Sequence, residues 1–314
     1  MAEEDPAPAQ AQAPDICVLL NTRSGKRRRA AEAQLHAAFE RHPGRFTLRV
    51  LKSGQDIERS AQAATSEGFP TIVAAGGDGT ISAIAPIVSK AGLRFGVLPF
   101  GTFNYFARSI GMPEEIDAAV DCLVTGEERR ISRSEVNGAG FLNNASLGAY
   151  AAILQRRERI YRRWGRSRIA AYWSVIVTLL RMRTSQPMRI TVDGETREVR
   201  TPLAFVAANA FQLETFGLPG VEEVRQGKLA LFLAPDTTGP ALLAFALRLS
   251  AGGMEKNRDF TLLTGSEIRI ETHRKRRLVA RDGEKSHMTS PFDFKIHPGA
   301  LRLIVPPQGA DETG

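Results

Sequence analysis

The sequence predicts a two-domain protein, with an N-terminal three-layer α/β domain and a C-terminal antiparallel β-sandwich. Between residues 16 and 125, short apolar runs alternate with helical stretches, which is typical of βαβ units around a mostly parallel sheet. From residue 132 onward, many short β-like runs with turn signals between them replace this alternation. A chain of 314 residues is long enough for two such domains.

The first domain is predicted to contain four strands and five helices. The strands cover residues Ile16–Leu20, 45–51, 71–75 and 94–98. The helices cover residues 27–40, 56–68, 80–90, 105–110 and 114–125. Ligands of parallel sheets bind beyond the carboxyl ends of the strands. The loops that follow residues 20, 75 and 98 are therefore the expected ligand site.

The second domain is predicted from shorter runs, with a boundary near residues 130–134. Its β-like runs are 135–136, 188–192, Leu203–Ala207, Leu229–Leu233, 267–271, 278–280 and 301–305. Helical stretches at 149–182 and 240–251 interrupt them. The resulting division is a disordered lead at 1–14, an α/β domain at 15–133 and a β-sandwich at 134–301 with a basic helical insertion at 149–183. The C-terminal tail, 302–314, is expected to return to the first domain.

Composition limits the class of protein. Residues 1–14 are rich in Ala, Pro and Gln and lack the apolar core of a signal peptide. The longest nearly uncharged apolar run, 169–180, has 12 residues and is too short to span a bilayer. Cys17 and Cys122 lie in separate apolar elements, which favours neither a disulfide framework nor a zinc site. These features predict a cytoplasmic protein.

The basic charge is concentrated in one segment. Residues 156–183 contain nine arginines and one glutamate, which equals the whole net charge of +8. Smaller basic clusters occupy residues 26–29 and 274–277. Such concentrated charge suggests an anionic partner, either a membrane surface or a nucleic acid.

The turn Gly76–Thr80 is the most informative short motif. An apolar β-branched run enters three glycines around Asp78, and a helix follows. Glycines let a ligand approach the main chain, and the N-terminus of a helix favours anions. This pattern predicts a phosphate site, with an ordinary glycine-rich turn between strand and helix as the alternative.

Two common phosphate motifs are excluded. Residues 24–27 contain a Gly-Lys pair but lack the preceding glycine and the following Ser or Thr of a P-loop. Gly77–Gly79 lacks the third glycine of a dinucleotide fingerprint, and Asp78 would meet the pyrophosphate. An acid in such a turn is best explained by a divalent cation, or by bonds to the amides of its own loop.

Five motifs occur in the order of a known family. They occupy residues 21–25, 76–80, 98–104, 141–148 and 282–284. This series resembles the catalytic domain of diacylglycerol kinases, and more closely the bacterial lipid kinases related to sphingosine kinases. The resemblance extends from about residue 16 to residue 305. It implies a Rossmann-like N-terminal domain of NAD kinase/diacylglycerol kinase type, a C-terminal β-sandwich, and an active site in the cleft between them.

The resemblance also implies the chemistry, which is transfer of the γ-phosphate of ATP to a lipid hydroxyl with Mg²⁺. Glu284 matches the family's proton acceptor, and Asp282 and Asp78 join it as candidate catalytic residues. Asp78 is also the candidate metal ligand, and the metal would be the Mg²⁺ that is bound to ATP. The residues matched to nucleotide binding are Asn21, Ser24, Gly25, Ser53, Gly76, Gly77, Asp78, Gly79, Thr80, Ile81, Ser82, Gly101, Thr102 and Asn104.

Three positions complicate this match. Asp193–Glu195 also spells Asp-Gly-Glu, and its setting between two β-like runs predicts a hairpin turn. The copy at residues 282–284 has the position that the motif order requires, so Glu284 is the preferred base. Thr22 replaces the usual proline of the first loop, and Gln226 stands where many bacterial members carry the aspartate of a structural magnesium site. Glutamine is a weak ligand for a hard cation, so that site is in doubt.

The partners follow from the same reasoning. Residues 156–183 mix arginine with Trp, Tyr and aliphatic side chains, which favours docking on an anionic membrane over a solvated face. The protein is then expected at the inner face of the membrane, with a lipid substrate that carries a free hydroxyl. No nucleic-acid motif is recognised, and a homodimer stays open. An NAD kinase-like enzyme and a non-catalytic lipid- or nucleotide-binding regulator are the alternatives.

Overall fold

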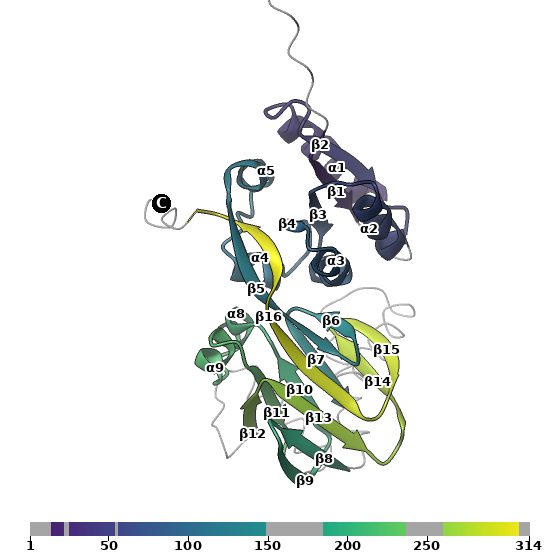
Figure 1. Cartoon of the computed structure of the whole chain (residues 1–314), viewed down its shortest axis with the longest axis vertical. Coiled ribbons are helices and arrows are strands. Elements are labelled where there is room, and N and C mark those ends of the chain that lie inside the picture. The colour runs from purple at the N-terminus through teal and green to yellow at the C-terminus, as the bar shows by residue number, and fades with distance from the viewer. Residues whose placement is uncertain (1–13, 22–24, 54–55, 149–184, 237–259, 308–314) are drawn as a thin grey trace, which may run out of the picture. The chain divides into compact units, whose positions relative to one another are not determined.

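A computed structural model describes residues 14–21, 25–53, 56–148, 185–236 and 260–307, and these form two compact units (Figure 1). The first unit comprises residues 1–102, 112–129 and 302–314, and the second comprises 103–111 and 130–301. Several predicted features lie outside the described residues. They are the N-terminal lead, Thr22, Ser24, the basic segment 156–183 and the helix at 240–251.

The first unit contains the predicted parallel sheet. Its strands are β1 (Ile16–Leu20), β2 (Phe46–Val50), β3 (Thr71–Gly76) and β4 (Arg94–Pro99), in the order β2-β1-β3-β4. All adjacent pairs are parallel. β1 and β3 are buried along their whole length, as expected of apolar strands with both faces covered.

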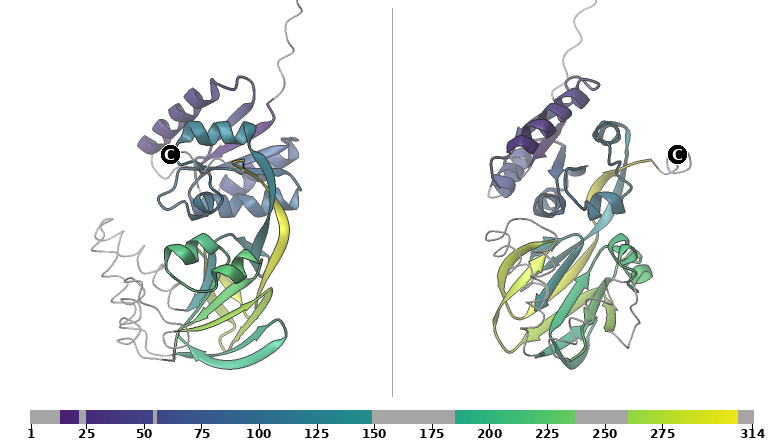
Figure 2. Two further views of the ribbon diagram at one scale, coloured as in Figure 1. Left: turned by 90° about the vertical axis from the view of Figure 1, so that its left-hand side faces the viewer. Right: turned by 180° about the vertical axis from the view of Figure 1, so that it is seen from behind.

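Helices cover both faces of this sheet (Figure 2). They are α1 (Gly25–Phe39), α2 (Asp56–Ser66), α3 (Asp78–Lys90) and α5 (Ile116–Thr125). α1 packs against α5, and α2 packs against α3. Right-handed crossovers place these two pairs on opposite faces of the sheet. The predicted α/β architecture is therefore confirmed.

The second unit contains two antiparallel sheets. One includes β5 (Glu127–Val136), β6 (Ala139–Phe141), β8 (Gln186–Val192), β9 (Glu195–Thr201), β13 (Glu267–Thr272) and β16 (Phe292–Val305). The other has the order β12-β11-β10-β7-β14-β15, with β7 (Asn144–Gly148), β10 (Leu203–Ala207), β11 (Leu229–Leu233), β12 (Thr261–Gly265), β14 (Arg276–Arg281) and β15 (Glu284–Thr289). The short helices are α4 (Tyr105–Ser109), α8 (Ala210–Thr215) and α9 (Val221–Arg225). The predicted β-sandwich is confirmed.

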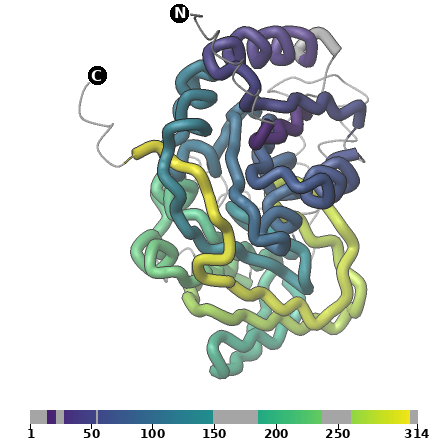
Figure 3. Tube along the Cα trace, turned by 45° about the horizontal axis from the view of Figure 1, so that its top comes forward, coloured from purple at the N-terminus to yellow at the C-terminus, as the bar shows by residue number. Residues whose placement is uncertain are grey.

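Two long strands, β5 and β16, have residues in both units and pair with each other (Figure 3). The end of β16 joins the parallel sheet, where Arg302 is the partner of Arg94 on β4. The Arg302 guanidinium donates two hydrogen bonds to Glu128 at 2.8 and 2.7 Å. The predicted run at 301–305 is thus the last part of a longer strand.

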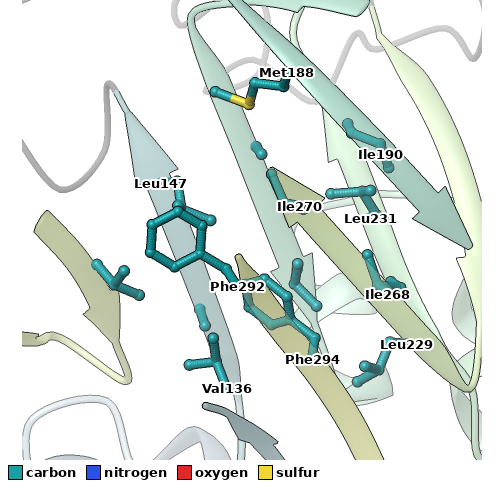
Figure 4. Close-up of a cluster of buried hydrophobic side chains, with 14 of the residues drawn as sticks. Val136, Leu147, Met188, Ile190, Leu229, Leu231, Ile268, Ile270, Phe292 and Phe294 are labelled. Carbon is teal, nitrogen blue, oxygen red and sulfur yellow. The ribbon is translucent and has the colours of Figure 1, made fainter. Parts of the chain in front are cut away.

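The interior of the second unit is a cluster of apolar side chains from both of its sheets (Figure 4). Phe292 and Phe294 project from β16, and neither side chain is exposed to solvent. Phe294 packs edge to face on Phe141, with the ring centroids 6.3 Å apart. Leu147 and Leu231 belong to the second sheet and complete the contact. Alternation of buried and exposed residues along the strands produces this core.

Truncation of this core should destabilise the protein strongly. Phe294→Ala is expected to lower the free energy of unfolding by about 3–5 kcal/mol, because it removes a buried ring and leaves a cavity. Urea unfolding followed by circular dichroism measures this loss. Phe103→Ala is the matched control, because Phe103 is 61% exposed and should change stability by less than about 1 kcal/mol. Equal losses in the two variants would contradict the assignment of the core.

The structure describes both cysteines and the helices in which a membrane span was sought. Cys17 and Cys122 are both buried and form no disulfide, and burial raises the pKa of each thiol to about 11. Neither thiol is therefore a ready nucleophile at neutral pH. Within the described ranges, no helix combines the length and the apolar character that a bilayer crossing requires.

Candidate functional site

The glycine-rich turn of the first unit lies where three strands end. Gly76 ends β3, Gly77 precedes the first residue of α3, and the main-chain amide of Phe100 donates to the carbonyl of Gly76 at 3.1 Å. A Cβ atom on Gly77 would lie 3.1 Å from the Cα of Gly101 in the loop after β4. The turn and the β4 loop therefore approach each other more closely than ordinary side chains allow.

The loop after β1 joins the same place. The Asn21 side-chain amide donates to the Thr80 hydroxyl at 2.8 Å, and the Asn21 main-chain amide donates to the carbonyl of Ala75 at 2.9 Å. Thr80 is 6% exposed. A Cβ atom on Gly76 would come within 2.7 Å of the Thr80 side chain. Gly76 thus leaves the space in which Thr80 meets Asn21.

The contact between Asn21 and Thr80 predicts a measurable coupling. In a double-mutant cycle with Asn21→Ala and Thr80→Val, the two changes should show a coupling energy of about 1 kcal/mol in urea unfolding, the usual net value of one hydrogen bond. Asn21→Ala with Ser89→Ala is the control cycle, because Ser89 lies in the last turn of α3. Additive effects of Asn21 and Thr80 would contradict the contact.

The start of α3 offers main-chain donors without a capping side chain. Asp78 is the first residue of the helix, and Gly77 before it supplies no side-chain cap. The amides of Thr80 and Ile81 already bond to the carbonyl of Gly77, so an anion would meet the main chain before Thr80. Such a helix N-terminus is an anion-binding feature, and Asp78 is a carboxylate able to hold a cation beside the anion. The helix begins at Asp78, two residues earlier than predicted.

The remaining residues predicted to bind the nucleotide differ in their exposure to solvent and in the unit to which they belong. Ile81 is buried, Ser82 and Gly79 are partly exposed, and Thr102 is exposed. Gly25 is the first residue of α1. Asn104 has a left-handed backbone with a φ of 50° and precedes α4, which is grouped with the second unit.

Ser53 has a local structural role. Its hydroxyl and main-chain amide both donate to the Asp56 carboxylate, at 2.9 and 3.1 Å. These bonds, led by the hydroxyl, hold the pKa of Asp56 below its usual range. Asp56 starts α2, so this arrangement accounts for Ser53 as part of a helix start.

In the second unit, Asp282 fastens a hairpin to the loop before β7. Its carboxylate accepts hydrogen bonds from the main-chain amides of Leu142, Asn143 and Asn144, at 2.7, 2.9 and 2.8 Å. Its own amide donates to the carbonyl of Asn144 at 2.9 Å. Asp282 and Gly283 have φ values of 44° and 85°, as a two-residue hairpin turn requires. Asp282 therefore holds the turn in place, and Glu284 is the exposed first residue of β15.

Buried amides extend this attachment. Asn209 donates to the side chain of Asn143 at 2.7 Å, and Asn144 donates to Gln212 at 2.9 Å. Asn209 also caps α8 by accepting from the amide of Gln212. All four side chains are at most 7% exposed. Sequence reasoning missed Asn209 and Gln212, although an asparagine close behind the apolar strand β10 was an available signal for a helix cap.

The second Asp-Gly-Glu copy is built in the same way. Asp193 and Gly194 have φ values of 46° and 92°, and the Asp193 carboxylate accepts from the amides of Ser266 and Glu267 at 2.9 Å each. The hairpin predicted for this copy is confirmed. Local geometry therefore does not distinguish the two copies, but their attachments do. Asp193 accepts hydrogen bonds from the turn before β13, whereas Asp282 accepts them from the main-chain amides of residues 142–144.

A structural magnesium site finds no support at Gln226. The Gln226 side-chain amide donates to the Glu222 carboxylate at 3.1 Å. In the part of the chain that the structure describes, no group of three or more His, Cys, Asp or Glu side chains is arranged to hold a metal. Gln226 itself offers no carboxylate to a cation, and its side chain bonds to Glu222.

Comparison with known families agrees with this architecture. Residues 15–136 match the diacylglycerol kinase catalytic domain, and residues 144–305 match the YegS C-terminal NAD kinase beta sandwich-like domain. A solved structure from Bacillus anthracis str. Sterne, described as of diacylglycerol kinase type, superposes with a TM-score of 0.70 at 21% identity. It covers 94% of this chain and 98% of that one. This similarity supports the fold.

Individual relatives are similar to this chain in sequence as well. A Synechocystis protein, sll0036, is 24% identical over 88% of this chain and 64% of its own length. "Lipid kinase YegS" of Escherichia coli K12 is 29% identical over 47% of this chain, and the match spans only half of that relative. "Probable lipid kinase YegS" of Salmonella arizonae is 28% identical over 94% of this chain and 97% of its own. Together with the two domain matches, these similarities show that the chain belongs to the family that joins a diacylglycerol kinase catalytic domain to a YegS-type β-sandwich.

Proposed function

We propose that this protein is a lipid kinase that transfers the γ-phosphate of ATP to a lipid hydroxyl at the cytosolic face of the membrane. The observation that carries the proposal is the convergence of three strand ends on the start of α3. There Asn21 bonds to Thr80, and Gly77 lies against Gly101. Family membership supplies the reaction type, and relatives named lipid kinase suggest the acceptor class.

The phosphates of ATP would be held by the first unit. The turn from Gly76 to Gly79 has Asp78 as its one side chain beyond glycine and leads directly into α3, whose dipole favours negative charge. Bound Mg²⁺ would offset the charge that develops on the transferring phosphoryl group. Asp78 is the residue of this unit that fits Mg²⁺, because its carboxylate stands at the anion site and hard cations prefer oxygen.

Glu284 of the second unit would take the proton. The lipid oxygen forms a bond to the γ-phosphorus while the bond to the β–γ bridging oxygen breaks and ADP leaves. The hydroxyl proton passes to the Glu284 carboxylate. The hydrogen bonds to Asp282 hold the turn that precedes Glu284. The backbone of Glu284 is therefore more restricted than that of a residue in an unattached loop. The glycine-rich turn proposed to hold ATP and the glutamate proposed to take the proton belong to different units.

A total lipid extract tests the proposal directly. Purified protein with Mg²⁺ and labelled ATP should yield a labelled lipid, which mass spectrometry identifies. Glu284→Gln serves as the inactive control, and a known lipid kinase shows that the extract contains acceptors. Absence of labelled lipid with the wild-type protein, while the known kinase labels one, would reject the proposal. Formation of NADP from NAD and ATP would replace it with the NAD kinase alternative.

A further inference from the structure

Four consecutive cations lie in the connection from β13 to β14 and in the first two residues of β14, where the chain passes from one sheet to the other. This basic tip consists of Arg274, Lys275, Arg276 and Arg277. The first three side chains are exposed, and Arg277 is partly buried. Within the described residues none of the four has a carboxylate within 4.0 Å, and none makes a side-chain hydrogen bond. Among the residues that the structure describes, the tip is thus a compact positive charge without a counterion.

Neighbouring arginines behave differently. Arg189 pairs with Glu198 at 3.0 Å, Arg200 pairs with Asp236 at 3.4 Å, and Arg269 pairs with Glu271 at 3.2 Å. Arg269 also reaches Asp293 at 3.1 Å. The surrounding strands therefore neutralise their cations, which leaves the basic tip as a local excess of positive charge.

The charges of the tip oppose one another. Burial lowers the pKa of Arg277, and the nearby charge of Arg274 lowers it further. Like charges held this close disfavour their charged forms, and an external anion relieves that cost. The arrangement thus favours binding of a negatively charged surface.

The backbone of the tip is held by hydrogen bonds. The Thr272 hydroxyl donates to the carbonyl of Arg274 at 2.8 Å, and the amide of Ser290 donates to the carbonyl of Lys275 at 2.7 Å. The Ser290 hydroxyl in turn accepts from the amide of Thr272 at 3.0 Å. Because the turn is already ordered, binding loses little further backbone entropy.

We propose that the basic tip docks on the anionic headgroups of a lipid bilayer. Three exposed cations and a fourth that is partly buried, in consecutive positions, fit the negative surface of such a membrane, where each cation contributes to attraction. Residues 272–277 contain no Phe, Tyr or Trp, and the imidazole of His273 is their one ring on which a nucleic-acid base could stack, which disfavours a single-stranded nucleic acid. The choice of a bilayer over other polyanions rests on the proposed function. The tip is separate in sequence from the arginines at 156–183.

Vesicle flotation with the full-length chain tests the tip. The test variant carries Arg274→Gln, Lys275→Gln and Arg276→Gln, and leaves the partly buried Arg277 unchanged. The control variant carries Arg59→Gln, Arg197→Gln and Arg225→Gln, which removes the same charge from exposed arginines that pair with carboxylates. Both are compared with the wild type on phosphatidylcholine vesicles with and without phosphatidylglycerol, at low and at high salt.

The test variant should bind the anionic vesicles about 100-fold more weakly at low salt, since each cation near such a surface is worth about a fivefold change. The control variant should stay within about threefold of the wild type, and salt should reduce the difference. Equal losses in both variants would overturn the proposal. Unchanged vesicle binding together with weaker binding to duplex DNA would assign the tip to nucleic acid instead.

Activity separates this proposal from the proposed function. Both stand if the test variant phosphorylates lipid in detergent micelles like the wild type but loses binding to vesicles. If the wild-type protein phosphorylates no lipid and the test variant still loses vesicle binding, the proposed function fails and the docking surface stands.

Discussion

Glu284→Gln is expected to lower kcat by about 100- to 10,000-fold, the range typical of a lost general base. The substitution keeps the size of the side chain and removes its ability to accept the hydroxyl proton. Glu284 is exposed at the start of β15, so the free energy of unfolding should change by less than about 0.5 kcal/mol. ATP binding, measured by calorimetry, should stay within a few-fold of the wild type, because the phosphate loops belong to the other unit.

The chain supplies its own control for this experiment. Glu195 is the first residue of β9, follows an Asp-Gly turn of the same geometry, and is also exposed. Glu195→Gln removes the same charge from the same local structure and should leave kcat unchanged. A large loss for Glu195→Gln with full activity of Glu284→Gln would move the base to the first copy. Full activity of both variants would remove the glutamate from the mechanism.

The sequence predicted the central elements of the fold because their physical signals are strong. β1 and β3 are fully buried apolar runs, and their predicted ranges match the observed ones to within one residue. β9 and β15 were missed, because charged residues interrupt any apolar alternation in Glu195–Thr201 and Glu284–Thr289. Both are edge strands of their sheets. Edge strands often carry charged side chains, so the pattern that identifies a buried strand is absent.

In the candidate site, too, some contacts could be predicted from the sequence and others could not. Asn21 and Thr80 lie 59 residues apart, yet the rule that parallel strands end at one edge predicted that their loops would be close. The attachment of Asp282 to Leu142–Asn144 could not be predicted, because it pairs a carboxylate with main-chain amides that have no residue signature. Ser53 stays a prediction as a nucleotide contact, and its hydroxyl bonds to Asp56 at the start of α2 in this structure.

Asp282→Asn is expected to show that Asp282 positions Glu284 and does not itself react. The asparagine oxygen can accept only part of the three hydrogen bonds, and its amide group would face main-chain donors. We expect a loss of about 2 kcal/mol in the free energy of unfolding, because bonds from amides to a charged acceptor are among the stronger ones. Displacement of the turn by a fraction of an ångström should lower kcat by about 10- to 100-fold.

Asp193→Asn separates positioning from stability in this experiment. The Asp193 carboxylate also accepts main-chain hydrogen bonds at a turn with positive φ, but it is attached to Ser266 and Glu267. Its substitution should lower stability by a similar amount and leave kcat and the KM for ATP unchanged.

If Asp282→Asn loses no more kcat than Asp193→Asn, the Asp282 attachment is only structural. If Asp282→Asn is as inactive as Glu284→Gln and no less stable than the wild type, Asp282 takes part in the chemistry directly. A large kcat loss that Asp282→Glu partly restores, at an unchanged KM for ATP, is the result expected of a residue that acts through the placement of Glu284.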